Sequence, residues 1–303
     1  MKILYFGNFT RSFSTENYVA YALGRLGQEV VEIPNTQFDV WEACKHRIMQ
    51  EAPDVVLFSK APVCHTDRIL DLCNGHNILS VCWHWDLYFG CGNRSNERWP
   101  QLRSDLLFST DGGHDLEFKN AGYSHQVLRQ GIHYPEAIIQ PPDYQYDVGF
   151  VGHNSEFQPG RPELIAHLSD TYGSRFSYVS NVRGLKLNKW LSQVKVVVGD
   201  SYPSDAGGYW SNRVYEVLGR GGFLLHPKVE GLEREFQSKK HLDTYTRSDF
   251  AELDDSIDYY LCNTPLQEAI RQAGHEHCRT NYTYFNRCRT LLAYIGAKCP
   301  SLI

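Results

Sequence analysis

Arg213 and Glu216 are the residues of this chain whose types and spacing best suit a chemical task. They stand three residues apart in the segment Tyr209–Pro227, which reads as a short helix, a glycine-rich turn and a buried strand. Residues at this spacing are neighbours on a helix surface. An arginine can bind a diphosphate as a bidentate donor, and a glutamate beside it can accept hydrogen bonds from a ribose. The pair, with the preceding Asn212, suits a nucleotide diphosphate, although the spacing by itself is more often that of an intrahelical Arg–Glu ion pair on a surface helix.

Two glycine turns supply further candidates for binding a phosphorylated ligand. Gly7 and Asn8 follow the first predicted strand, and Gly152, His153 and Asn154 follow a later one. Ligands of open α/β sheets bind at the carboxyl ends of the strands, and exposed N–H groups at helix starts favour anions. Neither turn has the G-x-G-x-x-G pattern of a dinucleotide site, and the chain has no P-loop motif.

Three residues that follow other predicted strands could act as a general base. Asp86 ends the segment W-H-W-D after a strand over 78–82, and Asp111 and His114 belong to S-T-D-G-G-H after a strand that starts at Leu106. A reaction that deprotonates a hydroxyl needs such a group within hydrogen-bond reach. The structural alternatives are a cap at Asp86 and an Asp-Gly turn at Asp111. A reaction that needs no base would leave all three with structural roles.

The loop over residues 83–103 combines aromatic residues with Arg94, Arg98 and Arg103. Long loops after strand ends often carry function. Aromatic and arginine side chains together suit a sugar, a nucleotide base or single-stranded nucleic acid. Aromatic residues can also simply pack a loop against its domain, and the sequence leaves both interpretations open.

Composition points to a globular protein of a reducing compartment. The nine cysteines include no C-x-x-C pair, which indicates free thiols and gives no support to a metal site. The formal net charge is −5, so no overall basic footprint for nucleic acid exists, although a local basic patch is compatible with it. Apolar runs are far shorter than the ~20 residues of a membrane helix, and the N-terminus shows no signal peptide. We therefore expect a cytoplasmic protein without a membrane span, or one of the host cytoplasm if a phage encodes it.

The elements that must position these residues alternate between strands and helices. Buried-type apolar runs separated by helical patterns favour an α/β fold with doubly wound parallel sheets. The pattern stops in a proline-rich stretch and then restarts, which predicts two Rossmann-like units facing across a cleft. The expected strands cover residues 2–6, 29–33, 54–59, 78–82, 106–109, 125–129, 147–151, 176–179 and 194–199.

These patterns predict three parts of the chain. Residues 1–140 form an N-terminal Rossmann-like domain, and residues 147–283 form a second one. The proline-rich stretch 135–146 has no periodicity and reads as the linker. Residues 284–303 carry a final helix that we expect to pack back on the first domain.

The second half resembles a known enzyme family. Its runs N-R-V-Y-E-V-L-G-R-G-G-F-L-L, P-K-V-E-G-L-E-R-E-F and N-Y-T-Y-F-N-R-C-R-T-L-L are similar to those of group 1 glycosyltransferases of the spore-maturation-protein-like type. The resemblance covers about residues 147–295 and implies a GT-B enzyme. The first half matches only in general pattern, as expected if it binds a variable acceptor.

The resemblance also implies roles for individual residues. It places Glu216 on the ribose and Arg213 on the diphosphate of a nucleotide sugar, with Gly152, His153 and Asn154 near the phosphates or the sugar. GT-A enzymes use a D-x-D motif to bind a metal, and no D-x-D occurs here. The expected enzyme therefore uses no metal or other cofactor, and takes a nucleotide sugar, UDP-linked, as co-substrate. Arginines and lysines replace the metal, with Arg161, Lys186 and Lys189 as weaker candidates beside Arg213.

The acceptor and the exact reaction stay open at this stage. A compact GT-B chain resembles phage DNA glycosyltransferases, which modify hydroxymethylated pyrimidines, but the acidic net charge counts against a DNA acceptor. A protein, a glycan precursor or a small metabolite are alternative acceptors. A nucleotide-sugar 2-epimerase would use the same donor site without an acceptor, and a two-domain ligand-binding protein is the non-enzymatic alternative.

Overall fold

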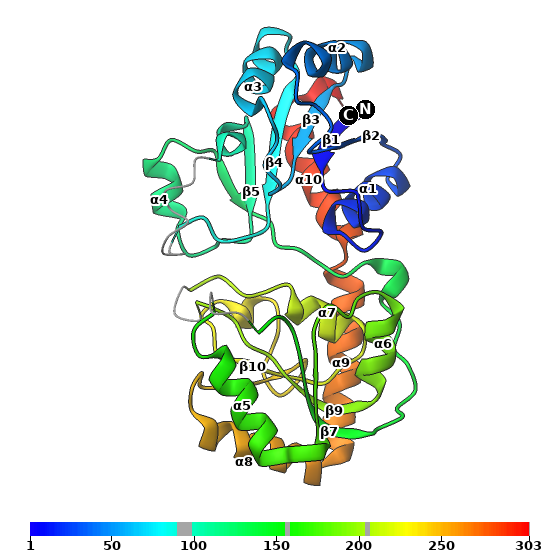
Figure 1. Cartoon of the computed structure of the whole chain (residues 1–303), viewed down its shortest axis with the longest axis vertical. Helices are drawn as coiled ribbons and strands as arrows, with labels where there is room; N and C mark the ends of the chain where they lie inside the picture. The colour runs from blue at the N-terminus through cyan, green and yellow to red at the C-terminus, as the bar shows by residue number, and fades with distance from the viewer. Residues whose placement is uncertain (90–98, 155–157, 204–206, 303) are drawn as a thin grey trace. The chain divides into compact units, whose positions relative to one another are not determined.

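A computed structural model describes residues 1–89, 99–154, 158–203 and 207–302. The chain divides into two compact units. Unit 1 comprises Met1–Gln130 together with Tyr284–Ile303, and unit 2 comprises Gly131–Thr283. Each unit is built around its own parallel β-sheet, and each is described by itself below (Figure 1).

Unit 1 holds a six-stranded sheet in the order β2-β1-β3-β4-β5-β6, with every neighbouring pair parallel. Its central strands are almost fully buried because helices cover both faces, which explains their continuous apolar runs. The strands are β1 (Lys2–Gly7), β2 (Glu29–Pro34), β3 (Val55–Phe58), β4 (Leu79–His84), β5 (Leu106–Ser109) and β6 (His125–Val127). The helices are α1 (Thr15–Arg25), α2 (Trp41–Glu51), α3 (Thr66–Gly75), α4 (Asp115–Asn120) and α10 (Tyr284–Lys298), with short 3-10 turns η2 (Pro100–Arg103) and η6 (Pro300–Leu302).

Two hydrophobic clusters form the two layers of unit 1. On one face, Val19 of α1 and Leu291 of α10 belong to the cluster that includes Trp83. On the other face, Ile48 of α2 and Ile69 of α3 pack with the remaining inward-facing strand residues. The final helix α10 follows unit 2 in the chain and yet supplies core residues to unit 1 (Figure 1).

Unit 2 holds a five-stranded parallel sheet in the order β11-β10-β9-β7-β8. Helices α6 and α7 contribute to one hydrophobic cluster, α5 and α8 contribute to the other, and α9 contributes to both. The strands are β7 (Tyr146–Val151), β8 (Phe176–Val179), β9 (Val194–Val198), β10 (Leu224–Pro227) and β11 (Asp243–Tyr245). The helices are α5 (Arg161–Tyr172), α6 (Leu185–Ser192), α7 (Arg213–Gly219), α8 (Phe250–Cys262) and α9 (Thr264–Asn281), with 3-10 turns η3 (Tyr134–Glu136), η4 (Gly173–Arg175) and η5 (Leu232–Arg234).

Both sheets share one topology. Renumbered from its first strand, each reads 2-1-3-4-5, and unit 1 adds a sixth strand at the far edge. The strand order reverses between β1 and β3 in unit 1 and between β7 and β9 in unit 2. Such switch points are where doubly wound sheets bind ligands, at the carboxyl ends of the strands. The predicted fold class, two Rossmann-like parallel-sheet domains, is confirmed.

The proline-rich segment 135–146 does not hang free between the units as a linker would. The chain passes from unit 1 to unit 2 between Gln130 and Gly131, so the whole segment lies within unit 2. The Asn188 side-chain amide donates to the carbonyl oxygens of Glu136 and Ile138 at 2.9 and 2.8 Å. The backbone amides of Asp143 and Gln145 also donate to the carbonyl oxygens of Ser192 and Gln193, each at 2.8 Å. These contacts anchor the segment within unit 2, and the sequence gives no local sign of them.

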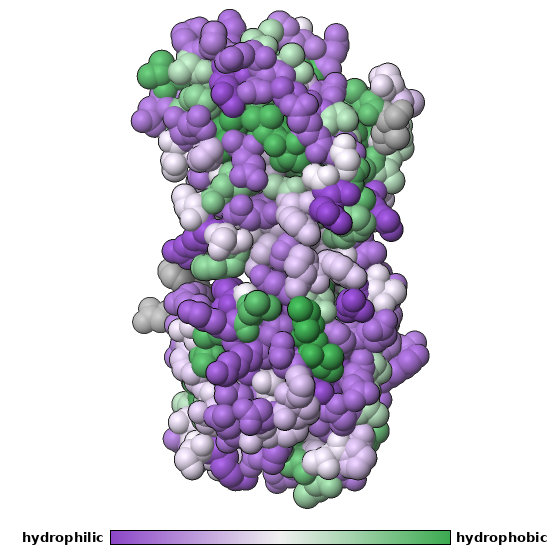
Figure 2. All heavy atoms as spheres, turned by 90° about the vertical axis from the view of Figure 1, so that its right-hand side faces the viewer, coloured by the Kyte–Doolittle hydropathy of each residue, from purple (hydrophilic) through white to green (hydrophobic). Residues whose placement is uncertain are grey.

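The face of the molecule in Figure 2 is largely polar. On the face that Figure 2 shows, hydrophilic residues predominate and apolar ones form separate, small patches. Exposed apolar side chains such as Leu116 and Leu185 come from different elements, as is ordinary for a globular protein. Within the described ranges, no helix combines the length and the hydropathy that crossing a bilayer requires.

Candidate nucleotide-sugar site

Arg213 spans the switch point of unit 2. It is the first residue of α7, and its Nε donates to the carbonyl oxygen of Val151 at the end of β7, at 2.5 Å. Its Nη1 donates to the carbonyl oxygen of Asp200, just after β9, at 2.7 Å. These two bonds tie the guanidinium to both strands that flank the reversal in strand order. The leading candidate of the sequence therefore lies where the topology predicts a ligand.

Asp200 gathers two further arginines at the same edge. Its carboxylate is 1% exposed and accepts hydrogen bonds from Nε of Arg161 and Nε of Arg247, each at 2.8 Å. Burial by itself raises the pKa of the Asp200 carboxyl, but the hydrogen bonds and charges of Arg247 and Arg161 outweigh it and hold that pKa below its usual value. Three guanidinium groups thus surround one ionised carboxylate, and the cluster is net positive.

The arginines are close enough to affect one another. Burial lowers the pKa of Arg213 to about 10, and the charge of Arg161 adds to this shift. Both guanidinium groups lie over the ring of Phe150, with their central carbons 5.2 and 5.9 Å from its centroid. Such cation–π contacts offset part of the mutual repulsion. Arg213 remains charged at neutral pH, so the unbalanced charge favours an anionic ligand here.

Gly152 leaves room for the guanidinium of Arg213. It follows β7 directly, with a φ of +156°, and a Cβ built on it would collide with Nη2 of Arg213. Nε and Nη1 of Arg213 donate to Val151 and Asp200, whereas Nη2 has no acceptor among the described residues. A glycine at this position is therefore required for the observed arginine conformer.

Glu216 is paired, but not with Arg213. Its Oε2 accepts from Nε of the buried Arg220, four residues on, at 2.9 Å. The ion pair between Arg213 and Glu216, which the spacing allowed, is not formed because Arg213 turns to the backbone of β7 and β9. Among the described residues, the only contact of Glu216 Oε1 is a long one of 3.4 Å with the side-chain amide of Asn212. One carboxylate oxygen is thus held by Arg220 while the other can accept from a ligand hydroxyl.

The other predicted donor-side residues take different positions. His153 and Asn154 are exposed, and they meet the rest of the site through the main chain. The carbonyl oxygen of His153 accepts from Nη1 of Arg161 at 3.1 Å, and the amide of Asn154 donates to the Tyr178 hydroxyl at 3.2 Å. Oδ1 of Asn212 is buried without a hydrogen-bond partner among the described residues. Of the weaker cation candidates, only Arg161 joins the cluster; Lys186 and Lys189 are exposed on α6.

A buried serine–histidine pair supports the start of α7. Nδ1 of His226 donates to the carbonyl oxygen of Pro227 at 2.8 Å, so its Nε2 accepts from the Ser201 hydroxyl at 3.0 Å. The Ser201 oxygen in turn accepts from the amide of Ser211 at 3.2 Å. Burial lowers the pKa of His226 to about 4, and the nearby Arg213 contributes to the shift. The imidazole is therefore neutral, and it holds the segment that leads into Arg213.

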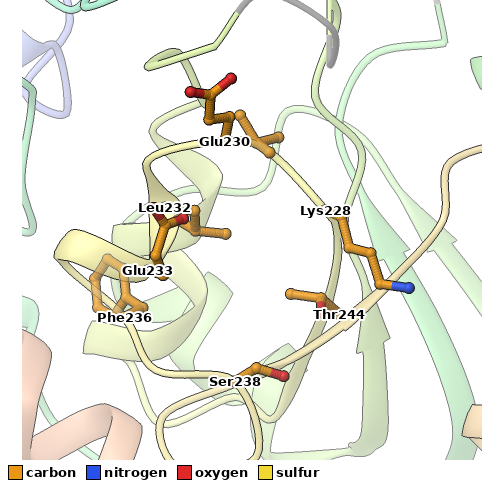
Figure 3. A pocket seen from close by; sticks show the side chains of 8 residues that line it. Lys228, Glu230, Leu232, Glu233, Phe236, Ser238 and Thr244 are labelled. Atoms are coloured by element: carbon orange, nitrogen blue, oxygen red, sulfur yellow. The ribbon is translucent and has the colours of Figure 1, made fainter.

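A pocket lies on the neighbouring strands of the same edge. It has a volume of about 310 Å³ and is lined by residues that follow β10 or belong to β11 (Figure 3). Leu232 and Phe236 give it an apolar side, and Lys228 and Thr244 stand on another side. Nζ of Lys228 is already engaged by Oε1 of Glu252 at 2.7 Å. The pocket therefore offers mainly an apolar surface and belongs to the segment P-K-V-E-G-L-E-R-E-F that carries the family resemblance.

The switch point of unit 1 is built differently. Gly7 closes β1, and a Cβ on it would lie 2.6 Å from Cγ of Glu16, a residue of the first turn of α1. Glu16 is 6% exposed, and its Oε1 accepts from the Ser59 hydroxyl at 3.1 Å. Asn8 is exposed, and its Oδ1 accepts from the amide and hydroxyl of Thr10 in a local turn. A carboxylate, rather than a guanidinium, thus lies against the glycine at the end of the first strand of this sheet.

The three candidate bases lie at the same edge of unit 1. Asp86, after β4, accepts from Nζ of Lys60 at 2.8 Å in a partly exposed ion pair. Asp111, after β5, is fully buried, and Nδ1 of His114 donates to its two carboxylate oxygens at 2.8 and 3.0 Å. The amide of Gly113 also donates to Asp111, in the Asp-Gly turn that the sequence allowed. Because Asp111 is enclosed, His114 is the member of this pair that a ligand can reach.

The aromatic loop is described only in part. Arg94 and Arg98 lie outside the described residues, and Arg103 belongs to η2, where it forms an ion pair with the exposed Asp67. Tyr88 and Trp99 line a pocket of about 490 Å³ with these two residues. The cysteines of the described ranges form no disulfide, and no group of three metal-ligating side chains occurs there.

Sequence reasoning missed three residues at the two switch points. Asp200 directly follows the run V-K-V-V-V-G, so its place after a buried strand was available as a signal. Glu16 stands in the first turn of a predicted helix, where an acidic residue is usually explained by the helix dipole. Arg247 follows β11, a three-residue strand that no hydrophobic pattern marks. Its approach to Asp200 is a tertiary contact without a local signature.

Comparisons with known proteins agree with this architecture. Residues 149–293 match a family model described as glycosyl transferase-like. No curated protein matches the chain significantly. Among solved structures, a glycosyltransferase from Rickettsia africae is 9% identical, with a TM-score of 0.70 and 98% of each chain covered. HepE from Anabaena in complex with UDP and glucose is 12% identical, with a TM-score of 0.67, 98% of this chain and 100% of that chain covered. Sucrose-phosphate synthase from Thermosynechococcus elongatus is 11% identical, with a TM-score of 0.69 over the same shares of the two chains.

Similarity at this level of identity shows the fold, which is GT-B. Together with the family match over the second half, it confirms the enzyme class predicted from the sequence, a glycosyltransferase. The donor, the acceptor and the residues that act in transfer are proposals, which follow.

Proposed function

We propose that this glycosyltransferase-like enzyme moves a sugar from a nucleoside diphosphate sugar, UDP-linked, to an acceptor hydroxyl, and that the diphosphate binds at the switch point of unit 2. The observation that carries this proposal is the cluster of Arg213, Arg161 and Arg247 around Asp200. Its net positive charge lies at the crevice where sheets of this topology bind phosphorylated ligands.

The cluster suits the chemistry of the leaving group. Glycosyl transfer builds negative charge on the departing diphosphate, and fixed positive groups in a partly buried site stabilise that charge. Two backbone carbonyls already hold the Arg213 side chain, so little conformational entropy is lost when a ligand binds to it. We propose that the arginines carry this role without a metal ion. Glu216 lies one turn further along α7, where its Oε1 can accept from the ribose.

The comparisons support UDP as the nucleotide. HepE was solved with UDP-glucose as well as with UDP, and a Staphylococcus aureus protein of the same fold, MnaA, was solved with UDP. An apolar pocket beside β10 offers a surface for the flat faces of a ligand. The narrower likeness to spore-maturation-protein-like enzymes stays a prediction from the sequence.

The comparisons do not identify the molecule that carries the acceptor hydroxyl. The hydroxymethylated pyrimidine in phage DNA anticipated from the sequence has no support among them, and two arginines of the loop that favoured it lie outside the described residues. For proton removal, His114 oriented by Asp111 has the arrangement of a general base, with Nδ1 bound to a carboxylate and Nε2 left to face a substrate. Asp86 and its partner Lys60 are the alternative.

Calorimetric titration with UDP and UDP-glucose tests the donor site. We expect UDP to bind the wild-type protein and Arg213→Ala to weaken binding about 100-fold, because a buried charged partner of the ligand is lost. Glu216→Gln should weaken it about tenfold or less, since one ribose contact changes. Arg175→Ala, which removes an exposed partner of Asp147 in the same unit, is the matched control and should bind normally. Equal affinities for wild-type and Arg213→Ala proteins would remove the cluster from the donor site.

A further inference from the structure

Arg220 is a buried arginine that two carboxylates share. It caps the C-terminal end of α7 and is 1% exposed. Its Nε and Nη2 each lie 2.9 Å from Oε2 of Glu216, and Nη2 also donates to Oε2 of Glu136. Burial by itself lowers the pKa of Arg220, but the charges of Glu216 and Glu136 outweigh it and hold that pKa above its usual value. One cation thus faces two ionised carboxylates, and the trio carries a net negative charge.

The remaining nitrogen of this guanidinium is bound at the start of α6. Nη1 of Arg220 donates to Oδ1 of Asn188 at 2.7 Å and to the carbonyl oxygen of Gly184 at 3.2 Å. Asn188 is 1% exposed, and its side-chain amide in turn donates to the carbonyl oxygens of Glu136 and Ile138. All three guanidinium nitrogens are therefore engaged, and a buried network satisfied in this way fixes the orientation of its members.

Glycines on both sides of the arginine bring Glu136 to it. A Cβ on Gly219 would lie 2.8 Å from side-chain atoms of Ile132. One on Gly221, which has a φ of +77°, would collide with the side chain of Ile139. The two isoleucines flank Glu136 in the segment that begins unit 2. Because neither glycine carries a side chain, this segment lies directly against the end of α7.

The network leaves one oxygen of Glu216 to a ligand. Arg220 holds Oε2 through two nitrogens, whereas the only contact of Oε1 within the described ranges is the long one with Asn212. Glu136 alone would neutralise Arg220, so Glu216 is the carboxylate in excess. A carboxylate only accepts hydrogen bonds, and the negative charge of the trio disfavours a phosphate. A hydroxyl is therefore the group that suits Oε1.

We infer that Arg220, together with Glu136, is a positioning residue that fixes Glu216 as the acceptor of a ribose hydroxyl, so that this hydroxyl determines which nucleotides the site selects. The inference rests on the proposed function, because it concerns the ribose of that donor. A carboxylate already held in place loses little conformational entropy when the ribose binds. A nucleotide without the hydroxyl leaves Oε1 desolvated and without a donor, which lowers affinity.

Calorimetric titration with UDP, 2′-deoxy-UDP and 3′-deoxy-UDP tests the inference. We expect the wild-type protein to bind at least one of the two deoxynucleotides about tenfold more weakly than UDP, because a hydrogen bond to a charged group is lost. Glu216→Gln should reduce this ratio to about twofold or less, since the charge of the acceptor is removed. A loss of stability alone would weaken the binding of all three nucleotides and leave the ratio unchanged.

Two substitutions of the arginine examine positioning directly. Arg220→Met keeps most of the side-chain volume and removes every contact with Glu216. Arg220→Lys retains the charge, which protects folding, but a single ammonium cannot reproduce the bonds of the planar guanidinium. Both variants should reduce the ratio to less than about threefold. Arg175→Met, which replaces an exposed arginine of the same unit, is the matched control and should keep the full ratio.

The possible failures separate the two claims. If the wild-type protein does not bind UDP, the proposed donor site is wrong, and the inference is wrong with it. If the wild-type protein binds UDP and both deoxynucleotides equally, the donor site stands and the ribose role of Glu216 is wrong. If Arg220→Lys binds all three nucleotides more weakly and keeps the tenfold ratio, Arg220 supports only the fold, and its positioning role is overturned.

Discussion

The two switch points of this protein share a topology and differ in charge. In unit 2, Arg213 crosses from β7 to β9 and is joined by Arg161 and Arg247. In unit 1, the corresponding crevice between β1 and β3 holds the carboxylate of Glu16. Fold therefore decides where a ligand can bind, and the side chains at that place decide its charge. An anion therefore fits the edge of unit 2 better than it fits the edge of unit 1.

Of the substitutions considered, removal of the Asp200 carboxylate should have the largest effect on the stability of unit 2. Asp200→Ala leaves Arg161 and Arg247 next to one another without their shared carboxylate, and breaking a buried pair in this way costs about 3–5 kcal/mol. We expect the unfolding of unit 2 in urea to shift to lower concentration, with UDP binding weakened at the same time. Asp71→Ala, an exposed carboxylate of α3 in unit 1, should change stability by less than about 0.5 kcal/mol. Equal stability of the two variants would mean that Asp200 does not organise the cluster.

Acid should destabilise unit 2 through His226. Its pKa is lowered by burial to about 4 in the folded protein, so between pH 6.5 and 4 the unfolded chain binds a proton that the folded chain does not. Stability is full above pH 6.5 and declines as the pH falls, by about 3 kcal/mol for this residue at pH 4.

Urea unfolding of the wild-type protein and of His226→Gln at pH 7 and pH 4.5 measures this loss. The variant should lose less stability than the wild-type protein between these two pH values. His241, in the same unit, also has a pKa lowered by burial to about 4, so the variant should retain part of the acid sensitivity. Identical losses in the two proteins would show that His226 is already protonated or is not buried in solution.

Two alanine substitutions should separate the switch points by function. Gly152→Ala places a Cβ against the guanidinium of Arg213, and Gly7→Ala places one against Glu16. Overpacking of this kind costs about 1–3 kcal/mol, or a displaced side chain. We expect Gly152→Ala to raise the Kd for UDP about tenfold and Gly7→Ala to leave that Kd unchanged. The reverse pattern would contradict the assignment of the donor site to unit 2.

The smallest effect should come from the exposed ion pair at the edge of unit 1. Nζ of Lys60 and the carboxylate of Asp86 lie 2.8 Å apart, with 48% and 34% of their side chains exposed. Solvent screens such pairs, so Lys60→Ala should cost less than about 1 kcal/mol. If Lys60→Ala lost as much stability as Asp200→Ala, the ligand-facing edges of the two sheets would depend equally on charge pairing.

The sequence predicted the fold because its patterns are local. Runs such as V-V-L-F and V-K-V-V-V are continuously apolar, as strands covered on both faces must be, and Ser14 does cap α1 by accepting from the amide of Asn17. The short edge strand β11 escaped detection because its three residues, Asp243–Tyr245, carry no such pattern. Edge strands need less apolar sequence because only part of their surface is covered.

The candidate site was predictable in part. Arg213, Gly152 and the carboxyl ends of the strands could be identified from residue type and from their order along the chain. The partner of Glu216 was predictable in part, since Arg220 stands at the favourable i+4 spacing, but Arg213 at i−3 is also compatible with an ion pair on the helix surface. The contacts of Asp200 with Arg161 and Arg247 join residues 39 and 47 positions apart, and no local pattern marks them.

The sequence by itself determined two parallel α/β units and the types of residue at their strand ends, because hydrophobic period and strand order are properties of short segments. Only the tertiary structure decided which charges meet there. It turned Arg213 away from Glu216 to the backbone of β7 and β9, and it brought Arg161 and Arg247 to Asp200. It also placed the Glu16 side chain against Gly7, because the packing of α1, rather than proximity in sequence, fixes the position of that side chain.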